Sequence, residues 1–458
     1  MWQANIRYSW ANGWSFYYVR VIEIPKPRWT PYERYLMRYQ GPRKNAPTPR
    51  RSGTRRSEDR PNAPRGLIIT ASVLVFVGCA AVKERSPLPS EFVGQAEIPG
   101  VPKARTWGDE WPRWLADRLS TITSAEAKDQ LGVLYDAPHN YLAISGGGAN
   151  GAFGAGLLAG WTESGTRPEF TAVTGISTGA LTAPFAYLGP EYDDVLREVY
   201  TTISTNDIAK RKRRSILSIF RSEAVSDTAP LRALIEKAVN ADVIAAIAEE
   251  YRSKGRRLFI GTVNLDASRS VIWNIGEIAN SDYPRRNALI HDILQASSAF
   301  PIAFPPVMIP VNVGTQTYDE MHVDGGAGMQ VFMYPAAVDF RWVTEKLKVH
   351  GQPKVYVIRN AFLDPDYSGV QRTMIPIAQR SIRSLVRTQG IGDLFQIHSL
   401  CIRDGNEFNL AYIPANFEEV PSEAFDPAYM KALFEYGFEM AKDGYDWKNA
   451  PPGYQLPD

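Results

Sequence analysis

Two glycine-rich turns, each between a short apolar run and a helix-like run, constrain the fold of this chain more than any other feature. The six segments alternate as strand, turn and helix: Tyr141–Ser145, Gly146–Gly151, Ala152–Glu163, Phe170–Thr174, Gly175–Gly179 and Ala180–Leu188. Short apolar runs bounded by glycine are typical of buried strands, and strands that alternate with helices favour a parallel sheet. The sequence therefore predicts an α/β fold with a mainly parallel central sheet.

The second turn has the pattern Gly-x-Ser-x-Gly, with Ser177 between Gly175 and Gly179. In a tight strand-to-helix turn, such a serine exposes its hydroxyl, and the first N–H groups of the next helix point at the developing negative charge. Ser177 is therefore a candidate nucleophile. The pattern is short, and an ordinary Gly/Ser turn explains it equally well in a chain with 35 glycines.

The first turn, Gly146–Gly151, has three interpretations. A P-loop requires Lys followed by Ser or Thr at its end, and Ala152 stands there instead. A dinucleotide-binding loop matches the glycine spacing but requires an acidic residue at the end of the next strand, where Gly175 stands. The third interpretation is an oxyanion hole, in which free N–H groups face a tetrahedral intermediate. Both turns would then adjoin at the carboxyl ends of neighbouring strands.

A serine nucleophile needs a base, for which the chain offers histidines and an aspartate. The five histidines are His139, His291, His322, His350 and His398. His350 lies in a polar loop and His398 in a helical pattern, so neither has the surroundings of a catalytic base. His322 would share a strand face with Asp324. Asp324 ends a strand before Gly325-Gly326, which leaves room for its side chain to approach Ser177. An ordinary Asp-Gly turn is the alternative.

These three motifs together resemble the patatin-like phospholipase family. The order is strand-GGGxxG-helix, strand-GxSxG-helix, and then Asp-Gly-Gly 147 residues after the serine. The block Ala296–Val307 is also similar to that family, and the region 370–415 looks like its bacterial lipoprotein-type branch. The resemblance implies a three-layer α/β/α fold, with Ser177 as nucleophile and Asp324 as proton acceptor in a dyad without histidine. It also implies an oxyanion hole and a nucleophile elbow, formed by Gly146, Gly147, Gly148 and Gly151 and by Gly175 and Gly179, respectively.

One position departs from the family pattern. The family usually has Arg or Lys just before the last glycine of the first motif, and this chain has Asn150. The change removes a fixed cation near the phosphate or oxyanion site. It puts in doubt a strong preference for anionic phospholipid, but not acyl hydrolysis itself.

The motifs favour a lipid acyl-ester hydrolase of the phospholipase A, lysophospholipase or esterase type, with no cofactor and no metal. A catalytically weak lipid-binding envelope lipoprotein that keeps the fold is the alternative. An NAD-dependent oxidoreductase rests on the glycine loop alone. The expected partners are a lipid substrate and a membrane, with no nucleic acid, and the sequence leaves the oligomeric state open.

The first 65 residues differ in charge from the rest. They carry a net charge of +10, and the remainder carries −8. Their Pro, Arg and Ser content predicts a disordered basic extension, which could lie upstream of the true start. Gly66–Gly78 is a 13-residue apolar or small run, too short to span a bilayer and typical of a signal h-region. Small residues before Cys79 resemble a lipobox, and that resemblance implies a lipidated mature N-terminus at the bacterial envelope.

The organisation expected from these patterns has five parts. They are a basic extension over 1–65, a signal segment and lipobox over 66–79, a tether over 80–105, a patatin-like domain over 141–337, and a C-terminal part, 338–458, packed on the same domain. We see no domain break between about residues 105 and 450.

Overall fold

The computed structural model describes residues 10–11, 14–15, 85–131, 133–211, 226–365 and 367–454. The chain separates into two compact units, Met1–Cys79 and Ala80–Asp458. In the first unit, β1 (Trp10–Ala11) pairs antiparallel with β2 (Trp14–Ser15). The rest of the predicted basic extension, the predicted signal segment and Cys79 lie outside the described residues. The following paragraphs concern the second unit.

The described part of the second unit is built on a nine-stranded mixed sheet. Seven strands follow the order β10 (Val307–Val313), β11 (Gln316–Asp324), β8 (Arg257–Asn264), β5 (Ala172–Gly175), β4 (Asn140–Ile144), β12 (Lys354–Phe362) and β13 (Glu407–Ile413). Five neighbouring strands, β8, β5, β4, β12 and β13, are parallel to one another. β9 (Arg269–Asn274) pairs antiparallel with β8, and β3 (Arg105–Trp107) pairs with β9. The predicted parallel core is confirmed, and the antiparallel strands β10, β11, β9 and β3 extend it.

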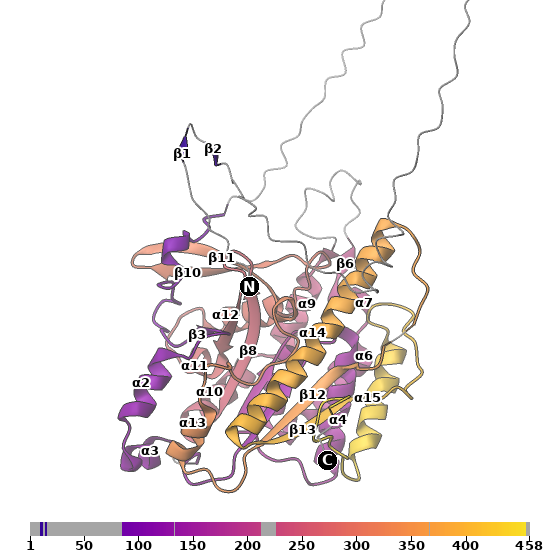
Figure 1. Cartoon of the computed structure of the whole chain (residues 1–458). Helices are drawn as coiled ribbons and strands as arrows, with labels where there is room; N and C mark the ends of the chain where they lie inside the picture. Colours follow the sequence, from indigo (N-terminus) through magenta and orange to yellow (C-terminus); the bar gives the residue numbers. More distant parts are fainter. Residues whose placement is uncertain are drawn as a thin grey trace, which may run out of the picture. The chain divides into compact units, whose positions relative to one another are not determined.

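The central strands are buried on both faces, as expected for parallel strands covered by helices. Leu142 and Ile144 of β4 face one hydrophobic core, and Tyr141 and Ala143 face a second one. The first core also receives side chains from α4 (Gly151–Glu163), α5 (Thr178–Leu188), α12 (Arg286–Ser297) and α15 (Pro427–Ala441). The second core receives α14 (Met374–Asp404), which crosses the sheet in front of β12 and β13 (Figure 1). The predicted three-layer α/β/α arrangement is confirmed.

The remaining helices lie around these layers (Figure 1). They are α2 (Arg113–Thr121), α3 (Ser124–Leu131), α6 (Asp193–Thr202), α7 (Thr205–Ile208), α9 (Ala229–Ala238), α10 (Ala241–Lys254), α11 (Ile275–Ala279) and α13 (Phe340–Leu347). No helix among the described residues combines the length and apolar character needed to cross a membrane.

Glycines let α4 and α15 pack backbone against backbone. A Cβ at Gly156 would lie 1.9 Å from the carbonyl oxygen of Phe434, and a Cβ at Gly160 would lie 2.2 Å from that of Phe438. Gly437 of α15 approaches the carbonyl oxygen of Phe153 in the same way. The small residues that predicted a helix after the first turn therefore also allow α15 to pack closely against that helix, α4.

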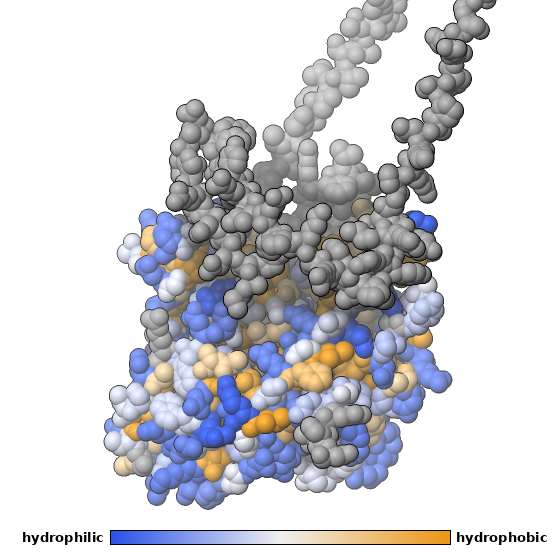
Figure 2. Space-filling view, viewed as in Figure 1, coloured by the Kyte–Doolittle hydropathy of each residue, from blue (hydrophilic) through white to orange (hydrophobic). Residues whose placement is uncertain are grey.

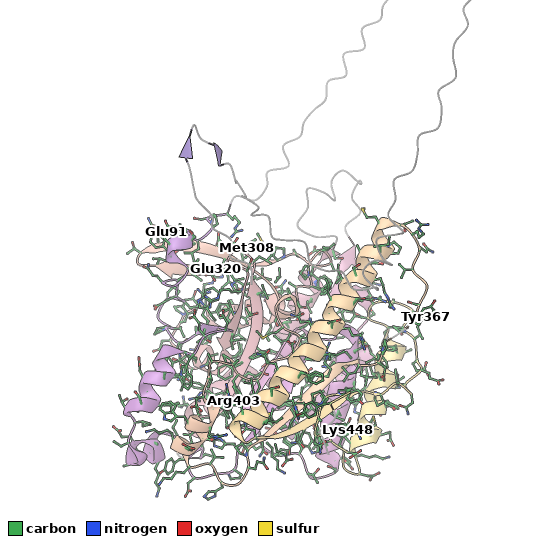
Figure 3. The ribbon with its side chains drawn as sticks, viewed as in Figure 1. Glu91, Met308, Glu320, Tyr367, Arg403 and Lys448 are labelled. Carbon is green, nitrogen blue, oxygen red and sulfur yellow. The ribbon has the colours of Figure 1, made fainter. Side chains whose placement is uncertain are left out.

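The structure corrects the prediction of a tether over 80–105. From Arg85 onward the segment packs beside the β10–β11 hairpin, since Arg85 donates to the carbonyl oxygen of Asp319 and Pro87 bridges to Asp319. Figure 3 labels Glu91 of this segment and Met308 and Glu320 of the hairpin. Ile98, Val101 and Ala104 are buried, and the backbone of Glu97 bridges to Asn312. Composition suggested a polar linker, but these spaced apolar residues bury enough surface to hold the segment on the domain.

Candidate active site

Ser177 lies in a strained turn between β5 and α5. Its φ is 54°, a left-handed value that is uncommon outside glycine. A Cβ at Gly175 would lie 2.4 Å from the carbonyl oxygen of Gly179, and a Cβ at Gly179 would lie 2.3 Å from that of Ile144. The backbone N–H of Ser177 donates to the hydroxyl of Ser297 at 3.0 Å. The turn therefore has the geometry of a nucleophile elbow, and both glycines are sterically required.

Asp324 lies at the end of β11 and interacts with Ser177. Burial raises the pKa of its carboxyl to about 7, although hydrogen bonds from the Gly326 backbone and the Ser177 side chain act in the opposite direction. The Gly326 N–H donates to Oδ1 of Asp324 at 2.7 Å. A hydroxyl and a carboxyl that ionises near neutrality therefore lie together in a buried position.

The glycine loop offers two free N–H groups beside this pair. Within the described residues, the N–H groups of Gly147 and Gly148 donate no hydrogen bond. A Cβ at Gly147 would lie 2.3 Å from the carbonyl oxygen of Asn360, and Gly148 has a φ of +58°. A side chain at either residue would therefore disturb the loop.

The structure corrects the roles of the other two loop glycines. The N–H of Gly146 donates to the carbonyl oxygen of Gln330 at 3.0 Å, and that of Gly151 donates within the loop. Neither N–H is free for an oxyanion. Gly151 is instead required by packing, because a Cβ there would lie 2.1 Å from Oγ1 of Thr178. Thr178 follows the serine, and its N–H is also without a partner in the described structure.

Asn150 ties the loop to the C-terminal helix. Its Oδ1 accepts a hydrogen bond from the hydroxyl of Tyr429, on α15, at 2.7 Å. Asn150 therefore links the glycine loop to α15.

Sequence analysis missed a buried cation that contacts the loop, Arg359, in the second half of β12. Its Nη1 donates to the carbonyl oxygen of Gly146 at 3.2 Å, and its residue is only 2% exposed. Burial lowers the pKa of the guanidinium to about 10, partly offset by Asp393. The neighbouring Asn360 donates to the carbonyl oxygen of Ser145 and accepts from the N–H of Gly154. An Arg-Asn pair within a buried apolar strand was the signal that could have revealed both.

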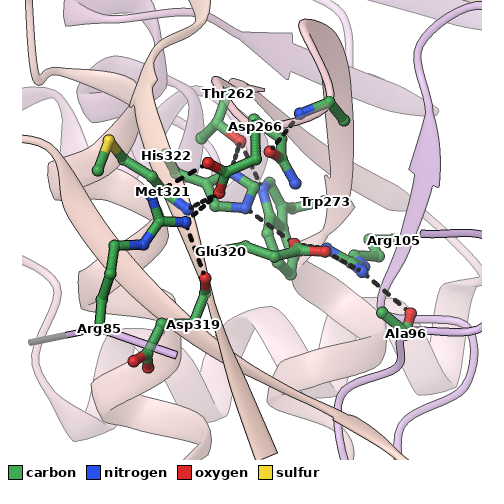
Figure 4. A network of polar contacts seen from close by, with 12 residues as sticks. Arg85, Ala96, Arg105, Thr262, Asp266, Trp273, Asp319, Glu320, Met321 and His322 are labelled. Carbon is green, nitrogen blue, oxygen red and sulfur yellow. Dashed lines mark hydrogen bonds and ion pairs between the residues drawn. The ribbon is translucent and has the colours of Figure 1, made fainter. Parts of the chain in front are cut away.

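A buried polar network anchors the strand that carries Asp324 (Figure 4). Glu320 and His322 are both fully buried on β11, with Nε2 of His322 3.1 Å from Oε2 of Glu320. Arg105 pairs with Glu320, and Nδ1 of His322 lies 2.9 Å from Oγ1 of Thr262. Burial raises the pKa of Glu320, but His322 and Arg105 outweigh it and bring that pKa to about 2. β3 is therefore linked through Arg105 to the strand of Asp324, and Arg105 also donates to the carbonyl oxygen of Ala96 in the segment before β3.

None of the five histidines contacts Ser177 or Asp324 in the described structure. Burial lowers the pKa of His322, which bonds Glu320 and Thr262. His350 pairs with Asp136 on the surface, and His398 packs against the rings of Phe408 and Tyr454. The remaining two, His139 and His291, bond backbone carbonyl oxygens elsewhere.

Comparison with known proteins adds one family match and two similar structures. Residues 142–337 match the family model of patatin-like phospholipase. VipD from Legionella pneumophila has a TM-score of 0.32 and 12% identity, over 67% of this chain and 67% of that one. Human GIVD cytosolic phospholipase A2 has a TM-score of 0.33 and 10% identity, over 74% of this chain and 64% of that one. No curated protein matches the chain. The segment that matches the patatin-like phospholipase model contains both glycine turns and Asp324.

Proposed function

We propose that the chain is a lipid acyl-ester hydrolase that uses Ser177 and Asp324 as a catalytic dyad. The observation that carries the proposal is the interaction of a serine in a strained strand-to-helix turn with a buried carboxyl whose pKa is about 7. A carboxyl with that pKa is a competent base near neutral pH, because about half of it is ionised there and the ionised form accepts a proton readily.

In the first half of the reaction, Oγ of Ser177 attacks the carbonyl carbon of the ester, and its proton passes to Asp324. The carbonyl oxygen becomes an oxyanion, and the free N–H groups of Gly147 and Gly148 are the donors that stabilise it. The tetrahedral intermediate then collapses. The bond to the leaving oxygen breaks, and Asp324 returns the proton to the departing alcohol.

In the second half, a water molecule attacks the acyl-serine. Asp324 takes one proton from the water, the same N–H groups hold the second oxyanion, and collapse releases a fatty acid. Ser177 recovers its proton from Asp324, so the enzyme returns to its starting state.

Labelling and lipid assays test this function. A fluorophosphonate probe should label the full chain, and Ser177→Ala should abolish the labelling. A panel of phosphatidylcholine, phosphatidylglycerol, lysophospholipid and triacylglycerol then identifies the substrate class. Binding to lipids without labelling or release of fatty acid would instead support the non-catalytic lipid-binding alternative.

We further propose that the protein acts at the bacterial envelope, anchored through acylated Cys79. This proposal rests on the charge step, the 13-residue apolar run and the small residues before Cys79. A single acyl chain anchors only marginally, so a stably bound lipoprotein requires several chains. Wild type should fractionate with membranes after salt washes, and Cys79→Ser should leave the chain unprocessed or soluble. Mass spectrometry that finds a mature soluble form beginning upstream of Gly66 would contradict the anchor.

A further inference from the structure

The two halves of α14 have different surroundings. From Gly390 onward, residues that face the sheet are buried, among them Leu394, Ile397 and Cys401. The preceding segment, Met374–Thr388, which we call the outer half of α14, is largely exposed. Three of its apolar side chains reach the surface, at 77% exposure for Met374, 50% for Ile377 and 70% for Leu385.

The exposed apolar side chains of the outer half gather on one side. Helix positions 374, 378, 381 and 385 lie on one face, because they are spaced by three or four residues. An open groove of about 580 Å³ lies along the outer half, and its lining includes Val370, Ile377, Ser381 and Leu385. Hydrophobic and hydrophilic residues are interspersed on the face of the molecule that carries α14 (Figure 2). The outer half therefore combines exposed apolar side chains with an adjoining open groove.

The charge of the segment has one sign only. Between Ser368 and Gly392 the chain carries four arginines, Arg372, Arg380, Arg383 and Arg387, and no Asp or Glu. An exposed helix that combines apolar side chains with arginines complements a surface with an apolar interior and negative headgroups.

The same helix reaches the Ser177 site at its next turn. Gln389 donates to the carbonyl oxygen of Gly328 and accepts from Nε2 of Gln330. A Cβ at Gly390 would lie 2.5 Å from the guanidinium of Arg359, which holds the glycine loop. The helix that carries the exposed outer half therefore also contacts residues around the Ser177 site.

We propose that the outer half of α14 docks on the surface of an anionic phospholipid bilayer. Its apolar face enters the headgroup region, and the exposed guanidinium of Arg383 pairs with lipid phosphates. The purpose of this docking, which is to present lipid esters to Ser177, rests on the proposed function.

The test is sedimentation with vesicles, using the full chain in a Cys79→Ser, Ser177→Ala background. This background removes both the proposed anchor and hydrolysis of the vesicles. We expect binding to phosphatidylglycerol/phosphatidylcholine vesicles to exceed binding to pure phosphatidylcholine vesicles. Met374→Asp with Leu385→Asp should lower the partition coefficient for the anionic vesicles at least tenfold. Arg383→Gln should lower it about fivefold, the effect of one charge near an anionic surface.

The matched control is Ile402→Asp with Val420→Asp. These apolar side chains are 59% and 83% exposed and lie outside the outer half, so the control adds the same charge elsewhere. Its binding should stay within about twofold of the parent, since lipid attraction decays within a Debye length. Equal losses in the two double variants would overturn the proposal, as would no sedimentation of the parent or equal binding to both vesicle types.

A second measurement separates this proposal from the proposed function. With Ser177 restored, both double variants should hydrolyse a short-chain p-nitrophenyl ester at the parental rate, which also shows that they fold. Lack of ester hydrolysis in the parent would contradict the hydrolase but leave the vesicle result standing. Loss of ester hydrolysis in the Met374→Asp, Leu385→Asp variant alone would overturn the docking proposal.

Discussion

The turn that holds Ser177 and the strand end that holds Asp324 are built in different ways. The Ser177 turn is shaped by nearby glycines, since a Cβ at Gly175 or Gly179 would collide with backbone atoms. The carboxyl of Asp324 depends on burial by distant segments, and its strand is anchored through Glu320 to Arg105, 215 residues earlier in the chain. The comparison teaches that local sterics place the hydroxyl, whereas tertiary packing sets the pKa of the carboxyl.

The largest expected effect comes from removing either member of the proposed dyad. Ser177→Ala and Asp324→Asn should each remove most esterase activity without unfolding the chain, and the double variant should lose little more, because the residues act as a unit. Steady-state kinetics and circular dichroism measure this. His350→Ala is the control and should cost at most a few-fold. Near-normal turnover by Asp324→Asn would exclude Asp324 as the base.

The next largest effect is expected from substitutions in the glycine loop, which test the role of local sterics. Gly147→Ala should lower kcat by roughly 10²–10³, because the new Cβ meets the backbone of Asn360 and displaces an oxyanion donor. Gly148→Ala has open space around its Cβ but a φ of +58°, so its loss should be smaller. A Gly148→Ala loss larger than that of Gly147→Ala would show that strain, not collision, controls the loop.

A smaller effect is expected for Arg359, which contacts the glycine loop from β12, a strand distant in the sequence. Arg359→Met should lower kcat about tenfold with little change in KM, because a charged hydrogen bond to Gly146 is lost. Gly390→Ala should reproduce part of this effect, since its Cβ displaces the guanidinium without removing the charge. Thermal unfolding is the control. If the loss of kcat in both variants is accompanied by a marked fall in Tm, the role of Arg359 is purely structural.

The smallest effect concerns pH and tests the tertiary origin of the Asp324 pKa. Only ionised Asp324 accepts the serine proton, so kcat/KM should rise as pH increases through about 7. The same raised pKa means that the folded state loses stability as pH rises from about 4 through 7, because the buried carboxyl must ionise. Asp324→Asn should therefore have a higher Tm than wild type at pH 8, but not at pH 4. Calorimetry at both pH values measures this difference.

Sequence analysis predicted the parallel core and both glycine turns, because each depends on a short pattern with a steric or chemical meaning. It predicted a tether over 80–105, which is wrong from Arg85 onward, since composition does not reveal that Ile98, Val101 and Ala104 join the first hydrophobic core. It also counted all four loop glycines as oxyanion residues. Gln330 occupies the N–H of Gly146 from another element, which no local pattern can show.

The amino-acid sequence by itself determined the elements around Ser177, because glycine spacing and apolar runs act over a few residues. Tertiary structure alone decided which N–H groups stay free, which cation supports the loop and where Asp324 titrates. Arg359 and Asn360 reach the loop from β12, more than 200 residues away in the chain. These properties arise from burial and from contacts between segments, and both exist only once the sheet has assembled and excluded water.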